Sequence, residues 1–461
     1  MRCLRSAAAV AVPVVLILLA CGFGTDAKHF PEPGVVVTAA PEYKALNGLR
    51  GEERFAKGAQ LLLVTNGNAA PLLEGFAAST DASVSFDGKK VLFAGKRSAA
   101  DAWAVWELTL ADRAVRKVSS GDADAVRPLY LPGDRLVFAR RGAHGFEIVA
   151  AQLDGTDELA LTHIEASALP VDVLADGRIL FEAGFPLGMS TADGAKPELF
   201  LVYQDGSGVE SYRCDHPAGN AAGRWGGKQL ASGDVVFTHG NSLARFTSPL
   251  AGEARVTAPA AEYAGGIAET ADGDWLVSAR ANASAHYALR EWKPGAAAMP
   301  TVFAKSGQDV VEPVILAAHD RPKKHPSGLH DWDYANLLAL DARQSRDGAI
   351  KATPATVRLE AMSANGSAKV LGTAPVETDG SFFVKVPGDT PIRFALLDGS
   401  GAVIRQEHGW FWIRKGEQRI CVGCHTGPEH AAENRVPAVL LRTIVPADLT
   451  GVEKSAKSGG R

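Results

Sequence analysis

The chain has 461 residues, of which 46% are hydrophobic, and its 48 basic residues nearly balance 52 acidic ones, for a formal net charge of -4. This composition is that of an ordinary globular protein, long enough for two or three domains. The near balance of charge, without a long basic run, excludes the positively charged surface that nucleic-acid binding requires.

The N-terminus is expected to be an export signal. The short basic region MRCLR precedes an apolar stretch that is too short and too interrupted by proline for a typical membrane span. The next residues, LLAC ending at Cys21, resemble the lipobox of bacterial lipoproteins, in which the cysteine is lipidated after cleavage. We therefore expect a lipoprotein signal peptide over 1–21, lipidation of Cys21 and a tether over 22–45. The alternative is a plain secretory signal with a chance cysteine. In the lipoprotein interpretation, Gly22 favours the outer membrane, facing the periplasm or the cell surface.

Residues 46–318 contain a repeat that predicts a β-propeller. Similar apolar segments recur 40 to 56 residues apart, each after a turn sequence such as DGKK and before a second alternating segment. A period near 40 to 45 with several short strands is typical of propellers built from four-stranded blades. The repeats also resemble Tol-associated propeller repeats. The five segments are VLFAG at Val91, LVFAR at Leu136, ILFEAG at Ile179, VVFTHG at Val235 and WLVSAR at Trp275.

Two further runs bear on the number of blades. QLLLVTNG begins at Gln60 and QDVVEPVIL begins at Gln308. These runs would share one blade and close the ring, so we favour six blades over five or seven.

A linker is expected over 319–349. The stretch AAHDRPKKHPSGLHDWD holds prolines, lysines and three histidines, His319, His325 and His330, which is typical of a surface segment. No regular spacing supports a metal site at these histidines.

Residues 350–461 are expected to form a second all-β domain. Segments such as ATVRLEAMSA, SFFVKVPG and IRFALLDG alternate apolar and polar residues, separated by turns such as TDGS. Such a set predicts a small antiparallel β-sandwich. The fold class is therefore all-β, with a propeller followed by a sandwich.

The motif Cys421-Val-Gly-Cys424-His425 directly follows the last of these strands. This C-x-x-C-H spacing is that of a c-type haem attachment, in which both thiols bond the porphyrin and the histidine is the proximal iron ligand. A zinc knuckle, a redox dithiol or chance would be the alternatives, but a zinc site needs further ligands and only His430 lies near. We expect one covalent haem c.

The stretch from Pro375 to Arg442, including GWFWIRKGEQRICVGCHTGPEH, resembles the haem-carrying middle domain of the hydrazine synthase alpha subunit. The resemblance implies a c-type haem protein with a propeller before the sandwich, and a possible haem-dependent oxidoreductase. It does not carry over the reaction, because the synthase relies on several haems and partner subunits, whereas this chain has one motif.

The sequence does not decide the sixth ligand of the haem iron. The candidates are His430, His408, Met362 and a residue of the propeller, and the sixth position could also be open. The run Trp410 to Trp412 would supply apolar walls, with the two tryptophans on one face and Phe411 on the other. Ordinary sandwich core is the alternative for these aromatic residues.

Cys214 and His216, in SYRCDHPAG, point to the same side of an extended segment, and His239 follows one strand pair later. Thiolate and imidazole suit zinc or copper, so these residues are candidates for a metal or for the distal side of the haem. The alternative is a buried, inert cysteine.

Two functions from different classes fit the sequence. The first is a redox protein, with a partner protein that exchanges electrons with the haem and a propeller that forms the partner or substrate surface. The second is a binding or scaffold propeller whose haem is structural. Hydrolase motifs are absent from the sequence.

Overall fold

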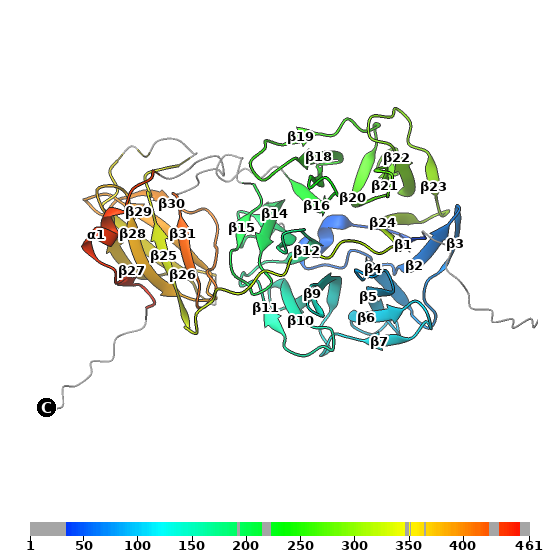
Figure 1. The fold of residues 1–461 in the computed structure, drawn as a ribbon, viewed down its shortest axis with the longest axis horizontal. Coiled ribbons are helices and arrows are strands. Elements are labelled where there is room, and N and C mark those ends of the chain that lie inside the picture. Colours follow the sequence, from blue (N-terminus) through cyan, green and yellow to red (C-terminus); the bar gives the residue numbers. More distant parts are fainter. Residues whose placement is uncertain are drawn as a thin grey trace, which may run out of the picture. The chain divides into compact units, whose positions relative to one another are not determined.

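The computed structural model describes residues 34–190, 194–213, 223–345, 350, 352–363, 366–423 and 433–451. Over these residues the chain forms eight four-stranded sheets, with one short α-helix and one 3-10 helix, so the fold is all-β (Figure 1). None of the helices in these ranges has the length and apolar character needed to cross a membrane.

Six of the sheets make up the propeller, which closes through both ends of its own sequence. In the closing sheet, the innermost strand β24 comes from the end of the propeller and pairs with β1 from its beginning. The run from Gln60 is β2 of this same sheet. From innermost to outermost strand, the six sheets are β24 (Asp309–Ile315), β1 (Val35–Ala40), β2 (Gln60–Thr65), β3 (Asn68–Pro71); β4 (Ala78–Val84), β5 (Lys90–Lys96), β6 (Ala104–Thr109), β7 (Val115–Lys117); β8 (Ala125–Leu131), β9 (Arg135–Gly142), β10 (Gly145–Gln152), β11 (Leu159–Ala160); β12 (Ala168–Val173), β13 (Ile179–Phe185), β14 (Lys196–Val202), β15 (Glu210–Ser211); β16 (Arg224–Gln229), β17 (Val235–His239), β18 (Ser242–Phe246), β19 (Ala254–Arg255); β20 (Glu262–Glu269), β21 (Trp275–Arg280), β22 (Ala288–Trp292), β23 (Thr301–Phe303).

The repeated segments of the sequence are the second strands of five consecutive sheets: β5, β9, β13, β17 and β21. Their central residues face the spaces between sheets, where Phe93, Phe138, Phe181 and Phe237 are almost completely buried. The predicted turns join the first and second strands, which confirms the interpretation of this repeat. Burial of these phenylalanines is a main source of propeller stability, because no sheet can cover both of its faces alone.

The propeller begins earlier than expected. Val35–Ala40 lies within the expected tether over 22–45, but it is strand β1 and lies between β2 and β24. The loop from β1 to β2 carries the 3-10 helix η1 (Ala45–Arg50) and buries Leu49, Arg54 and Phe55. The sequence VVVTAA does not predict a strand, because prolines lie on both sides of it and six residues are too few to show an alternating pattern.

The remaining two sheets form the sandwich. Their inner faces share one apolar core that includes Leu337, Leu359, Val384 and Phe394. The strands are β31 (Gln418–Cys421), β25 (Tyr334–Ala339), β28 (Phe382–Pro387), β32 (Ala447–Asp448) in one sheet, and β27 (Ala368–Pro375), β26 (Thr356–Met362), β29 (Ile392–Leu397), β30 (Val403–Gln406) in the other.

Two features of the sandwich differ from the sequence prediction. β25 lies within the expected linker over 319–349, so the sandwich begins at Tyr334. The edge strands β31 and β32 pair in parallel with β25 and β28, so one sheet is mixed and not purely antiparallel. Parallel pairing needs a crossover connection, and the long returns before β31 and β32 supply it.

The remainder of the linker crosses the propeller surface in an extended conformation. Its backbone N–H groups at His319 and Lys323 donate hydrogen bonds of 3.0 Å to Phe86 and Ala175, which lie in turns of two different sheets. The rings of His325 and His330 stack on Tyr203 and Trp332. No group of His, Cys, Asp or Glu that could hold a metal occurs within the described ranges, these linker histidines included.

Candidate functional site

Cys421 is the last residue of the edge strand β31, at the end of the mixed sheet. It pairs with Ala339 of β25, and its carbonyl oxygen accepts a 2.9 Å hydrogen bond from the Leu340 N–H. The Cys421 side chain packs against the sandwich core, and burial raises the pKa of its thiol. The thiol therefore lies at a fixed position where the chain leaves the sheet. Cys424, His425 and His430 lie outside the described residues.

The chain that leaves the sheet after Cys421 returns to the same place. The Arg435 side chain donates a hydrogen bond to the Leu340 carbonyl oxygen at 3.5 Å, while the Leu340 N–H bonds Cys421. Leu340 thus contacts both flanks of the motif. Cys421 and the side chain of Arg435 therefore lie beside the same backbone group.

This returning segment is held at Asp379, in the turn before β28. The Asp379 carboxylate pairs with Arg435 and accepts a 2.8 Å hydrogen bond from the Ala438 N–H. The next N–H, at Val439, donates to the Ser381 hydroxyl at 3.1 Å. These bonds fix the start of α1 (Ala438–Arg442) on the sandwich, and Val439 enters the space beside the core.

The charge of Asp379 contributes to this anchor. Burial opposes ionisation, but hydrogen bonds from Ser381, the Ala438 N–H and Arg435 outweigh it and lower the pKa of Asp379 from 3.8 to about 2. A depressed native pKa means that the stabilisation is fully present above the unfolded value and is lost as the pH falls toward 2.

We expect Asp379→Asn to reduce the free energy of unfolding at pH 7 by about 1 kcal/mol, because the hydrogen bonds and the ion pair that lower the pKa of Asp379 stabilise its charged form and solvent weakens them. The difference from wild type should fade between pH 4 and pH 2 in urea titrations. Asp398→Asn is the matched control, since Asp398 makes the same turn bonds to Ser400 on an exposed loop. A difference that does not change with pH would contradict the role given to the Asp379 charge.

The side chains of Trp410, Phe411 and Trp412 point to different sides of the chain, as alternation predicts. Phe411 packs against the sandwich core, whereas Trp412 is fully buried in a propeller cluster with Phe181 and Phe200. Trp410 is buried too, and its backbone N–H donates to the Leu187 carbonyl oxygen at 2.8 Å. The expectation that the tryptophans line a haem pocket is thus wrong for Trp412, because this indole holds the sandwich to the propeller. Of the proposed sixth ligands, His408 is exposed, and Met362 ends β26 in the other sheet.

The propeller approaches the same edge of the sandwich through the segment before Cys214. The Arg419 guanidinium donates to the Val209 carbonyl oxygen at 3.1 Å, and the Gly208 N–H donates to Glu417 at 3.3 Å. Arg419 lies two residues before Cys421. Cys214 and His216 themselves lie outside the described residues, as does Cys21.

His239 has a different role from the one its position suggested. Its Nδ1 lies 2.5 Å from Glu253, and the same carboxylate accepts a 2.8 Å hydrogen bond from the buried Arg224. The structure therefore places His239 in an ion-paired network at the propeller surface.

A second cluster, not foreseen from the sequence, lies at the centre of the propeller. Asp81, Arg127 and Glu312 each interrupt an innermost strand with a positive φ, of 58°, 54° and 57°. A shift in strand register accompanies each of them, so these are β-bulges that turn a charged side chain inward. The available signal was a single charge inside an apolar strand, as in AVRPLYL and DVVEPVI.

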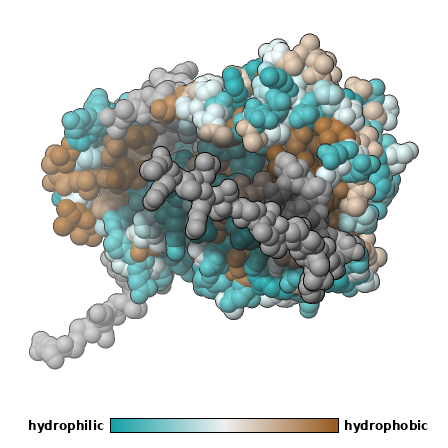
Figure 2. All heavy atoms as spheres, turned by 45° about the vertical axis from the view of Figure 1, so that its right-hand side comes forward, coloured by the Kyte–Doolittle hydropathy of each residue, from teal (hydrophilic) through white to brown (hydrophobic). Residues whose placement is uncertain are grey.

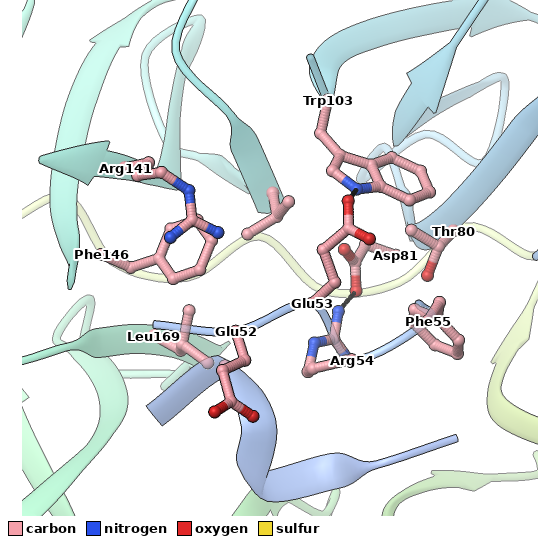
Figure 3. A pocket seen from close by; sticks show the side chains of 12 residues that line it. Glu52, Glu53, Arg54, Phe55, Thr80, Asp81, Trp103, Arg141, Phe146 and Leu169 are labelled. Carbon is pink, nitrogen blue, oxygen red and sulfur yellow. Dashed lines mark hydrogen bonds and ion pairs between the residues drawn. The ribbon is translucent and has the colours of Figure 1, made fainter. Parts of the chain in front are cut away.

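Arg54, from the loop between β1 and β2, enters this cluster and pairs with Asp81 (Figure 3). Arg54 also pairs with Glu312. Arg127 lies 3.6 Å from Glu182 and 3.8 Å from Glu312. The cluster thus joins sheets far apart in sequence. A cavity beside it, bordered by Trp103 and Phe146 among others, has a volume of about 20 Å³, which is room for about one water molecule and not for an organic substrate.

Comparison with known proteins agrees with this architecture. Hydrazine synthase from Kuenenia stuttgartiensis superposes with a TM-score of 0.76 at 15% identity, covering 90% of this chain and 72% of that chain. TolB from Acinetobacter baumannii gives a TM-score of 0.44 at 13% identity, covering 62% of this chain and 67% of that chain. No curated protein matches the sequence significantly. The first likeness supports a propeller followed by a sandwich.

One family model matches the part of the chain that includes the sandwich and its motif. Residues 336–426 match the model of the hydrazine synthase alpha subunit middle domain. This range begins in β25 and ends just after His425, so it includes the whole motif. The sandwich and its motif are therefore similar in sequence to the hydrazine synthase alpha subunit middle domain.

Proposed function

We propose that the chain is an exported monohaem c-type cytochrome, with haem c held covalently by Cys421 and Cys424 and with His425 as the proximal iron ligand. The observation that carries the proposal is the C-x-x-C-H motif, which begins at the end of a sheet edge. The motif lies in a region that matches a family named for hydrazine synthase.

The described residues fit this cofactor. Cys421 ends an edge strand, so the chain after it is not held between two neighbouring strands. The residues around the motif include exposed apolar side chains, among them Ile420 at 65% exposure. A porphyrin needs both a fixed thiol and apolar contacts. The haem would supply an iron that changes oxidation state or binds a small ligand.

The residues of this chain would hold that group in place. The backbone bond from Leu340 and the packing of the side chain fix Cys421, and the Arg435–Asp379 pair fixes the segment beyond the motif. The propeller, joined to β31 through Arg419, would provide the partner or substrate surface. We do not extend hydrazine formation to this chain, because its sequence holds one C-x-x-C-H motif.

The competing function is a propeller scaffold with a structural haem. The two functions differ in the accessibility of the iron. Optical spectra of the oxidised, reduced and carbon-monoxide-treated protein separate them. We expect reversible reduction, with a redox partner protein as the physiological donor or acceptor. A haem that neither reduces nor exchanges electrons would favour the scaffold.

We also propose that Cys214 or His216 lies on the distal side of the haem or holds a metal beside it. The support is the contact of Arg419 with Val209, five residues before Cys214. Cys214→Ala and His216→Ala should alter the ferrous carbon-monoxide spectrum or the metal content. Unchanged spectra and metal content in both variants would mean that Cys214 is a buried, inert cysteine.

The lipid anchor at Cys21 is a further proposal, and it rests on the lipobox resemblance. The wild-type protein should fractionate with outer membranes, and Cys21→Ser should release it or block its processing. If the wild-type protein is found wholly in the soluble periplasmic fraction, the N-terminal segment is a plain signal peptide without lipidation.

A further inference from the structure

The exposed apolar side chains of the chain gather around the motif. Eight large apolar residues are strongly exposed in the described ranges, and five of these lie between positions 420 and 445. Figure 2 shows apolar surface gathered on the sandwich. The five are Ile420 at 65%, Val436 at 60%, Leu441 at 76%, Ile444 at 83% and Val445 at 69% exposure.

These side chains are exposed on an anchored segment. Hydrogen bonds at Asp379 and Ser381 fix the start of α1, and Leu449 enters the sandwich core after it. On α1, Val439 is 3% exposed and Leu441 is 76% exposed, so the helix has one buried face and one apolar face in solvent. The segment cannot turn Leu441 inward without exposing Val439.

The sheet register places this segment at the same end as Cys421. Ala339 pairs with Cys421 on one side and with Phe382 on the other, and Ser381 next to Phe382 bonds Val439. Two strand spacings, about 10 Å, therefore separate β31 from the strand that holds α1. A porphyrin macrocycle can span such a distance.

We propose that Ile420, Val436, Leu441, Ile444 and Val445 form an apolar shelf that contacts the porphyrin attached at Cys421 and Cys424. This inference rests on the proposed function. Exposed apolar surface on this scale marks a binding site. Cys421, next to Ile420, and Arg435, next to Val436, both contact Leu340. The haem is the apolar group that the sequence places between these flanks.

The test uses the full-length protein in two series. In the haem-loaded series, Leu441→Gln/Ile444→Gln is compared with Leu250→Gln, a control at a residue that is 62% exposed on the propeller. Both variants should keep haem on a denaturing gel. The shelf variant alone should shift the midpoint potential downward, because more polar surroundings favour the ferric charge state.

The second series measures the shelf without haem. Cys421→Ala/Cys424→Ala should bind more 1-anilinonaphthalene-8-sulfonate than the wild type while circular dichroism shows an unchanged β content. Adding Leu441→Gln/Ile444→Gln should remove that increase, and adding Leu250→Gln should not.

The outcomes distinguish a failure of the apolar shelf from a failure of the proposed haem attachment. Attached haem with equal potentials in the shelf and control variants overturns the inference and leaves the proposed function intact. Dye binding that is equal with and without haem also overturns it, because the shelf would then face another partner. A wild-type protein without covalent haem overturns the proposed function itself.

Discussion

The double variant Cys421→Ala/Cys424→Ala is expected to lose all haem that survives denaturation. Both thioether bonds join the porphyrin to these two sulfurs, so the wild-type band should retain peroxidase stain on a denaturing gel and the variant band should not. The expected effect is complete loss. It is the largest effect that the structure and sequence predict.

Leu250→Gln is the control for this experiment, because it changes an exposed propeller residue and leaves both cysteines of the motif in place. Its stain should equal that of the wild type. Stain that persists in the double variant would mean that the haem is held by other residues, or without covalent bonds, and would remove the basis for a c-type assignment.

The second large effect concerns the centre of the propeller. Arg54→Ala should lower the free energy of unfolding of the propeller by about 3–5 kcal/mol, because the carboxylates of Asp81 and Glu312 would lose a buried partner. The side chain of Arg54 is only 4% exposed, so water does not replace it easily. Urea unfolding followed by tryptophan fluorescence measures the change.

Arg245→Ala provides the comparison for Arg54. Arg245 pairs with Asp234 at 3.1 Å, but its side chain is 45% exposed, and such pairs contribute about 0–1 kcal/mol. Equal losses in the two variants would contradict the view that the central cluster joins the sheets of the ring.

The sequence predicted the repeated part of the propeller well because burial there is regular. Phe93 and its counterparts occupy the same position in each second strand, so a period can be recognised from one sequence. The sequence does not predict the strands Val35–Ala40 and Tyr334–Ala339, because each is a single strand outside any repeat. Their pairing partners are far away in sequence, and local pattern carries no information about them.

The sequence predicts the motif of the candidate site but not the contacts around it. The motif at Cys421 is readable from spacing alone, since its chemistry depends on residues next to one another. Trp412 could not be placed, because alternation gives the face of a strand and not the domain that packs on it. The convergence of Cys421 and Arg435 on Leu340 depends on tertiary contacts, and so does the role of Asp379.

The most direct test of a covalent haem is the tryptic peptide from Ile420 to Arg435, which contains the whole motif. Liquid chromatography with absorbance and mass detection reports both the colour and the mass of this peptide. We predict Soret absorption and a mass that exceeds the bare peptide by one haem. A colourless peptide at its bare mass, with both thiols open to alkylation, would contradict the account.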